Sequence, residues 1–582
     1  MVRKEVVVND KIYICDSLDD NKIINNEGLI LCTWNSSSVD MNAISIASVV
    51  YSNEKEIGVL IRQRIEKFWA EESNLLTGDP KFHEYIYFNV LNEKSNLYRT
   101  ESLNETIKLI GLDFWLKKCK FKEARLSIED RNLAFAIQRI LENNGVTCQL
   151  VSKSFELTKP WLIISRGLFG FVAHVIANLP LALAPKRSFF LSKPQKLWAG
   201  YSEGLFYENG VIRNRFNHRL NDSAGGMAFS SVFLYTRGTL VRNVFSALRV
   251  QFKSSNNLIF IESLMSFSIV MKTLKSFASL ALPILMKRGK MKDLFMHYPE
   301  LIPVANDFFR SIYGFPALWN IYYKFLFSKM IGGVPTLNTV ILQSENQPWE
   351  DALIREFRSL NSGRVLSLLN CIVSTWDMRF WPVEINAPSR EDREYLCDNP
   401  INIKVLAQNS SNHIIHSVEP LIKLQNLRPD LVSQKREYIL VCGEYNMVRT
   451  TSLINYIQKW SLNKDVKVVF RPHPNCIKVI VPSEWILDES SNLIESITGA
   501  VSVITTTFTS IPLVCIKLQV KCLCLQDQRW INSSPFCDYD MVKIIKPNED
   551  FMEQLELSAN NSYVVNESNV HNNQVNWETL LN

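Results

Sequence analysis

Two apolar runs in the C-terminal part of the chain, each followed at once by a polar loop, constrain the fold most. Val466–Phe470 leads into Arg471-Pro472-His473-Pro474, and Val501–Ile504 leads into Thr505–Ser510. Short apolar runs bounded by turn signals are typical of buried strands. Proline near the start of Ile511-Pro512-Leu513-Val514 predicts a helix after the second loop. We therefore expect parallel strands whose loops meet at one edge of an open α/β sheet, where ligands bind.

Both loops carry groups that suit a phosphate. Backbone N–H groups point outward at a helix start, and the helix dipole favours an anion. The second loop adds the hydroxyl groups of Thr505, Thr506, Thr507, Thr509 and Ser510. Arg471 and His473 would supply positive charge from the first loop. Each loop alone is also compatible with a stiff turn or an ordinary helix start, so the phosphate site is predicted from their occurrence together.

Length and composition set the class of protein. A chain of 582 residues exceeds one hydrophobic core and predicts two large domains with insertions. Hydrophobic residues make up 47% and charged residues 21%, as in an ordinary globular protein. The net charge of +6 is mild, which argues against a nucleic-acid partner and fits weak attraction to an anionic surface.

Cysteine usage points to a reducing compartment. The twelve cysteines include no Cys-x-x-Cys pair, and several lie in apolar runs, which indicates buried reduced thiols. No apolar signal segment follows Met1. We expect a cytoplasmic protein, and we leave open whether it contacts the cytoplasmic face of the inner membrane peripherally. The eight histidines are scattered and no Asp-x-Asp stands at a strand end, so we predict no metal and no cofactor.

Strands alternate with helices in both halves of the chain. The stretch 384–400 carries proline and several charges without periodicity, and we interpret it as a linker. The predicted fold class is α/β, with two Rossmann-like domains that face each other across a cleft. The first domain covers residues 1–395, with helical insertions at about 160–195 and 264–330, and the second covers residues 396–582.

The two insertions leave alternatives open. Residues 167–184 are uncharged, but this length is marginal for a membrane span, which needs about 20 apolar residues. The segment is either a buried helical hairpin, which we favour, or an interfacial segment whose basic residues lie near lipid phosphates. Those basic residues are Lys186, Arg187, Lys193 and Lys196. The amphipathic stretch 264–285 precedes the basic cluster 287–292, which is either a solvated turn or a membrane-facing patch.

Several motifs carry a family resemblance. Arg471-Pro472-His473-Pro474 with the Ser/Thr loop resembles the His-Pro and Ser/Thr motifs of bacterial sialyltransferases and the Lys-Pro-His-Pro element of capsule Kdo transferases. Glu345-Asn346-Gln347-Pro348-Trp349-Glu350 and Trp376–Phe380 resemble two signatures of a bacterial family of surface carbohydrate biosynthesis proteins. The likeness spans about 190–530. Where that family would have a Gly-Gln-His-Ser turn, Asn370–Ser374 lacks the histidine.

Transfer from a CMP-activated ulosonic acid needs stabilisation of the leaving phosphate and a base or nucleophile on the acceptor side, and on this basis we assign roles to individual residues as hypotheses. Arg471 and His473 would bind the phosphate, the hydroxyl groups of Thr505–Ser510 the phosphate and the substrate carboxylate, and Glu444 the ribose or base. Glu345, just past a strand, is the first candidate for the catalytic carboxylate, with Glu203 and Asp377 in reserve. Glu345 is alternatively an acid that stabilises a helix N-terminus. We interpret Trp349 as a core residue.

The resemblance implies a GT-B glycosyltransferase of surface polysaccharide (O-antigen or capsule) biosynthesis. Its donor would be a CMP-activated nonulosonic or related ulosonic acid, and its acceptor a lipid-linked glycan. A UDP-sugar transferase or a CDP-polyol phosphotransferase on the same fold is the enzymatic alternative. The non-enzymatic alternative is a non-catalytic, membrane-associated scaffold of the polysaccharide assembly complex.

Overall fold

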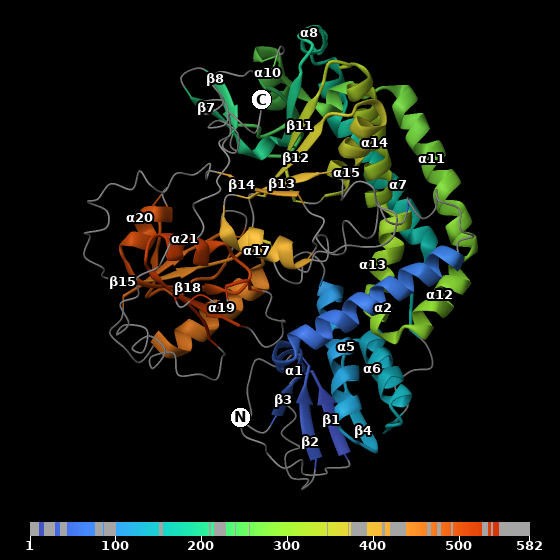
Figure 1. Ribbon diagram of the computed structural model, residues 1–582, viewed down its shortest axis with the longest axis vertical. Coiled ribbons are helices and arrows are strands. Elements are labelled where there is room, and N and C mark those ends of the chain that lie inside the picture. The colour runs from blue at the N-terminus through green and yellow to red at the C-terminus, as the bar shows by residue number, and fades with distance from the viewer. Residues whose placement is uncertain are drawn as a thin grey trace.

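The structure is a computed structural model. It describes residues 11–16, 29–34, 43–75, 85, 101–149, 155–208, 211–214, 229–238, 240–254, 257–345, 347–369, 372–373, 393–397, 399–409, 414–418, 438–461, 467–473, 476, 479–490, 493–526, 534–536, 539 and 541–545. Figure 1 shows three parallel sheets, with the N-terminal sheet at the bottom, the middle sheet at the top and the C-terminal sheet at the left.

The N-terminal sheet has five strands in the order β3-β2-β1-β4-β5. They are β1 (Lys11–Cys15), β2 (Leu29–Thr33), β3 (Ala43–Ser45), β4 (Glu123–Ser127) and β5 (Thr147–Cys148). The helices that accompany them are α1 (Ile46–Ser52), α2 (Glu54–Leu75), α5 (Glu101–Lys118) and α6 (Arg131–Asn143). The sequence predicted a single N-terminal domain, so this separate sheet is a structural feature that the prediction lacked.

The middle sheet has seven parallel strands in the order β10-β9-β6-β11-β12-β13-β14. They are β6 (Lys196–Tyr201), β9 (Ser230–Leu234), β10 (Leu258–Phe260), β11 (Thr339–Gln343), β12 (Arg364–Leu369), β13 (Glu394–Cys397) and β14 (Ile414–Ser417). A small antiparallel pair, β7 (Leu205–Glu208) and β8 (Val211–Asn214), lies beside it. The predicted domain boundary at 395/396 is wrong, because it falls inside β13, and β14 continues the same sheet.

The C-terminal sheet has six parallel strands in the order β17-β16-β15-β18-β19-β20. They are β15 (Tyr438–Cys442), β16 (Val468–Arg471), β17 (Ile486–Leu487), β18 (Ala500–Thr506), β19 (Lys521–Leu525) and β20 (Val542–Ile545). Its helices are α19 (Met447–Ser461), α20 (Leu493–Thr498) and α21 (Ile511–Lys517). Helix α17 (Pro400–Asn409) belongs to the middle sheet, because it connects β13 to β14 and contacts both.

All three sheets are doubly wound, because the first strand lies inside each sheet and the order reverses there. The reversal falls between β6 and β11 in the middle sheet and between β15 and β18 in the C-terminal sheet. The predicted α/β class with Rossmann-like parallel sheets is therefore confirmed. The predicted strands around the two polar loops are β16 and β18, and the predicted helix after the second loop is α21.

Helices of the two insertions, together with helices outside them, form a layer around α14 (Phe315–Gly332). They are α7 (Pro160–Asn178), η2 (Leu179–Leu183), α8 (Arg187–Leu191), α10 (Val244–Lys253), η4 (Ile261–Leu264), α11 (Phe267–Met286), α12 (Arg288–His297), η5 (Pro299–Leu301), α13 (Ile302–Tyr313) and, after β11, α15 (Pro348–Leu360). Five of them, α7, η4, α11, α13 and α15, contact α14 directly. Figure 1 shows α11 along the outer edge of this layer.

The favoured interpretation of 160–191 as a buried hairpin is wrong. Residues 160–183 form one helix with a 3-10 extension, and only 22% of its most apolar window is buried. One face, which includes Ile163, Gly167 and Phe171, packs inward. An apolar helix does not reveal from composition alone which of its faces a neighbour covers.

Gly167 allows α7 to approach the start of α14 closely. An added Cβ would lie 2.7 Å from the carbonyl carbon of Gly314 and 2.8 Å from the backbone nitrogen of Phe315. We expect Gly167→Ala to lower the free energy of unfolding by about 1–3 kcal/mol through overpacking. Gly289→Ala is the matched control, because an added Cβ there meets nothing within 4 Å. Chemical denaturation of both variants measures the difference, and equal effects would contradict the close approach.

Candidate functional site

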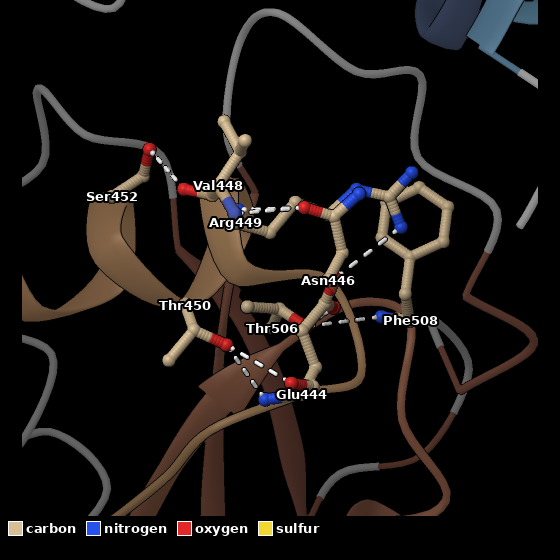
Figure 2. Close-up of polar contacts among 8 residues, drawn as sticks. All are labelled: Glu444, Asn446, Val448, Arg449, Thr450, Ser452, Thr506 and Phe508. Atoms are coloured by element: carbon tan, nitrogen blue, oxygen red, sulfur yellow. Dashed lines mark hydrogen bonds and ion pairs between the residues drawn. The ribbon is translucent and has the colours of Figure 1, made fainter. Parts of the chain in front are cut away.

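The reversal point of the C-terminal sheet brings Glu444 and Thr506 together. Glu444 follows the end of β15, Thr506 ends β18, and the Thr506 hydroxyl donates a hydrogen bond to Glu444 Oε2. Arg449 Nη1 lies 3.5 Å from Glu444 Oε1. All three side chains are buried. Figure 2 shows this cluster between the strand ends and the start of α19.

The local sequence explains the turn from β15 into α19. Asn446 Oδ1 accepts hydrogen bonds from the N–H groups of Val448 (2.9 Å) and Arg449 (3.2 Å), as expected of asparagine at a helix start. The Thr450 hydroxyl accepts from the Glu444 N–H at 3.0 Å and donates to the Glu444 carbonyl oxygen at 3.1 Å. These contacts hold the Glu444 backbone against the first turn of α19.

Phe508 links this cluster to the N-terminal unit. The Arg449 guanidinium carbon lies 3.7 Å from the centroid of the Phe508 ring, a cation–π contact. Phe508 also packs against the apolar cluster that includes Val50, Ile57 and Ile107 of α1, α2 and α5. The loop after β18 is therefore held on one side by the C-terminal sheet and on the other by helices of the N-terminal unit.

The hydroxyl groups of the Thr505–Ser510 loop serve different purposes. Thr505 Oγ1 donates to the Cys442 carbonyl oxygen at 3.1 Å, which ties β18 to β15. Thr509 Oγ1 accepts from the Ile511 N–H at 3.2 Å at the start of α21. Thr507 is buried and Ser510 is exposed. The helix start after this loop is thus confirmed, and phosphate binding by these hydroxyl groups stays a prediction.

The structure places Arg471 and His473 at the end of β16, the next strand outward. Arg471 Nη1 donates to Asp488 Oδ2 at 2.6 Å, to the Ser490 carbonyl oxygen at 3.0 Å and to Ser496 Oγ at 3.0 Å. These three partners give Arg471 a structural role between β16 and α20, a role that the sequence analysis missed because the partners lie 17 to 25 residues away.

His473 lies edge-on to Tyr445, with ring centroids 6.0 Å apart. Burial lowers the pKa of His473 below its usual 6.5. Its imidazole is therefore neutral near pH 7, so it would meet a phosphate as a hydrogen-bond donor and not as the positive charge that the sequence analysis expected.

In the middle sheet, Glu203 and Glu345 follow the two strands that flank the reversal point, β6 and β11. Glu203 is exposed, and its N–H donates to Thr236 Oγ1 at 3.1 Å. Glu345 is half-buried, and Gln347 Nε2 donates to its Oε2 at 3.4 Å. Asp377, the third acidic candidate, lies outside the described residues. The expected position of Glu203 and Glu345 at strand ends is confirmed, and their chemistry stays a prediction.

The Glu-Asn-Gln-Pro-Trp-Glu motif forms the start of α15. Glu350 Oε1 accepts from the N–H groups of Glu345 (2.8 Å) and Gln347 (3.1 Å), the latter being half of a capping box. Its Oε2 accepts from the Ser344 hydroxyl at 3.1 Å. Arg393 lies 3.9 Å from Glu350. The sequence analysis missed this role of Glu350, although Pro348 between Gln347 and Glu350 is a recognisable helix-start signal.

Trp349 is a core residue, as predicted. It is 1% exposed, and its Nε1 donates to the Tyr201 hydroxyl at 2.8 Å. Tyr201 ends β6, so this bond joins α15 to the strand on the other side of the reversal point. Among the described residues, no group of three or more His, Cys, Asp or Glu side chains could hold a metal ion.

No protein-family model and no curated protein matches the chain. Among solved structures, it is similar to UDP-GlcNAc 2-epimerase of Methanocaldococcus jannaschii in complex with UDP-GlcNAc and UDP, with 13% identity and a TM-score of 0.37, over 63% of this chain and 93% of that one. It is similar to MurG of Acinetobacter baumannii, with 10% identity and a TM-score of 0.33, over 62% and 89%. It is also similar to the calicheamicin glycosyltransferase CalG4, with 10% identity and a TM-score of 0.35, over 63% of this chain and 90% of that one.

Burial raises the pKa of Glu350 from 4.5 to about 7, although Arg393 and two backbone N–H groups oppose this shift. A raised pKa means that the folded state binds the proton more tightly than the unfolded state. We expect the stability of the wild type, measured relative to Glu350→Gln, to be greatest below pH 4.5 and to fall by up to about 3 kcal/mol as the pH rises through 7.

Urea denaturation of the wild type and Glu350→Gln across pH 4 to 8 measures this difference. Glu356→Gln is the matched control, because its half-buried side chain lies on the same helix. A stability difference between wild type and Glu350→Gln that does not change with pH would contradict the buried, raised-pKa carboxyl group.

Proposed function

We propose that the chain is a glycosyltransferase of GT-B architecture, acting in surface polysaccharide (O-antigen or capsule) biosynthesis. The observation that carries the proposal is that two of the doubly wound sheets, the middle and the C-terminal one, each have at least one glutamate at a strand end beside the reversal point. Glu444 occupies this position in the C-terminal sheet, and Glu203 and Glu345 occupy it in the middle sheet. Ligands of open parallel sheets bind at such points, so two substrates would each have a sheet.

The C-terminal sheet would bind the nucleotide of the donor. Glu444 is held by Arg449 and Thr506, so its carboxylate is oriented before a ligand arrives. A carboxylate at this edge suits recognition of ribose hydroxyl groups or a base amino group. His473 and the backbone and hydroxyl groups of 505–510 would contact the phosphate and stabilise the charge that develops on it as the leaving group departs.

The middle sheet would bind the lipid-linked glycan acceptor. Glu345 is our catalytic candidate, as the base that takes the proton from the attacking hydroxyl group. Its backbone N–H is held by Glu350, so the side chain extends from a fixed point at the strand end. Glu203, on the other side of the reversal point, is the reserve.

The donor we propose is a CMP-activated ulosonic acid, on the basis of the motif at residues 471–474 and the Ser/Thr loop. A UDP-sugar transferase and a CDP-polyol phosphotransferase remain the enzymatic alternatives, and a non-catalytic scaffold of the assembly complex is the other. The alternatives differ in which nucleotide the C-terminal sheet binds, or in whether it binds one at all.

Nucleotide binding separates these alternatives. We expect CMP to raise the free energy of unfolding by about 2.7 kcal/mol at one hundred times its dissociation constant, and UDP to have no such effect. Glu444→Gln should abolish the effect of CMP, because the amide no longer pairs with Arg449. Glu484→Gln, an exposed residue of the same sheet region, is the control. Thermal shift measures this; stabilisation by UDP alone would favour the UDP-sugar alternative, and by no nucleotide the scaffold.

Catalysis by Glu345 is tested with the donor that the nucleotide screen selects. We expect Glu345→Gln to lower kcat by about 10²–10⁴-fold, the contribution of a general base, with little change in nucleotide binding. Glu356→Gln changes a glutamate of α15, the helix that follows Glu345, at a position away from the strand end, and it should keep the wild-type rate. A wild-type rate in Glu345→Gln would remove Glu345 from the mechanism and direct attention to Glu203.

A further inference from the structure

The outer face of α7 and its extension η2 carries an apolar stripe that no described residue covers. Its members are spaced by three and four residues, and each is at least half exposed: Phe169 (78%), Val172 (50%), Ile176 (64%), Leu179 (58%) and Leu183 (79%). The opposite face of α7 is the one that packs inward. The helix is thus apolar on both faces, and only one of them is used within the chain.

Helix α11 repeats this arrangement. Phe267, Met271, Leu282 and Met286 are exposed by 81%, 47%, 52% and 87%, while Thr273, Phe277 and Ile284 are buried. Both α7 and α11 pack their inner faces against α14. These are the two helices among the described residues that are long and apolar enough to cross a membrane. A monomeric soluble protein rarely leaves contiguous apolar area of this kind open.

The charges within the two segments that contain these helices are of one sign. Residues 157–202 contain six Lys or Arg and no Asp or Glu, and residues 263–292 contain another six and no Asp or Glu. Some of these cations are structural: Lys186 Nζ donates to the carbonyl oxygens of Ala182 and Ser263, and Arg288 to that of Thr158. Others are exposed, among them Arg166, Arg187, Lys193, Lys272, Lys275 and Lys290.

We propose that the outer faces of α7–η2 and α11 form a surface that docks on an anionic phospholipid bilayer. Exposed apolar side chains would enter the interface between headgroups and acyl chains, and the surrounding cations would pair with lipid phosphates. A second copy of the chain fits this surface poorly, because a two-fold contact would place one basic segment against another. The inner faces of α7 and α11 pack against α14 and cannot contact lipid at the same time. The helices would therefore lie on the bilayer and not cross it.

This surface is separate from the proposed nucleotide site, so the two can be tested independently. The full chain is mixed with vesicles of phosphatidylcholine alone or of equal parts phosphatidylcholine and phosphatidylglycerol, and bound protein is measured by flotation. We expect binding to the anionic vesicles only, weakened by salt. Lys272→Gln/Lys275→Gln should lower the partition coefficient by roughly 30-fold, about fivefold for each lysine. Phe169→Ser/Ile176→Ser should lower it at least tenfold, on the order of the apolar area removed.

Controls match each change in kind. Ile480→Ser replaces an apolar residue that is 91% exposed elsewhere, and Lys55→Gln replaces an exposed lysine of α2. Both should bind vesicles as the wild type does, and unchanged thermal unfolding would show that every variant is folded. The proposal is overturned by absence of binding to anionic vesicles or by equal loss in the controls. It is also overturned by a dimer that Phe169→Ser/Ile176→Ser dissociates, or by protein that resists alkaline extraction from membranes as a spanning helix does.

Discussion

Burial of most of α14 is the constraint on which the first two thirds of the structure depend. This helix is apolar almost all round, so every side must be covered by another element. On one side α15 covers it, where Phe327 stacks on Trp349 with ring centroids 6.2 Å apart. Trp349 in turn contacts Tyr201 at the end of β6. The packing of α14 therefore positions the start of α15, and with it the loop that carries Glu345.

The same burial explains the outward-facing helices. Covering the remaining sides of α14 requires apolar faces on α7 and α11, and Gly167 brings α7 close. A soluble covering helix usually turns a polar face to water. In α7 the outer face is apolar as well, and in α11 the outer face carries exposed apolar side chains between lysines, so core packing alone does not account for their sequences. The exposed apolar residues on the outer faces of these helices are better explained by contact with a partner outside the chain.

Residues whose signal is local were predicted well. The apolar runs at β16 and β18 and the polar groups that follow them lie where their order in the chain placed them. Glu345 could be placed just past a strand for the same reason. Features that depend on distant partners were missed. Arg471 has its partners in Asp488 and Ser496, and nothing in the residues around position 471 distinguishes an arginine that binds a phosphate from one that pairs with an aspartate 17 residues away.

The misplaced domain boundary has a similar physical origin. Strand β13 is only four residues long and lies in a stretch rich in charges, so it shows no periodicity. Its assignment to the middle sheet comes from burial of Tyr395, Leu396 and Cys397 between β12 and β14, which only the assembled sheet provides. Likewise, the sequences of the five short strands in the N-terminal sheet do not indicate whether these strands pair with one another or with β6 and β11.

The two reversal points differ in a way that bears on the division of labour that we propose. Glu444 is 3% exposed and lies against a guanidinium and a hydroxyl donor, so its carboxylate is oriented and is not available to move. That suits recognition, where a fixed acceptor discriminates between ligands. The side chain of Glu345 is half-buried, whereas its backbone N–H is fixed by a hydrogen bond to Glu350. A side chain that can adjust on a fixed backbone suits proton transfer, because the base must approach the hydroxyl group as the new bond forms.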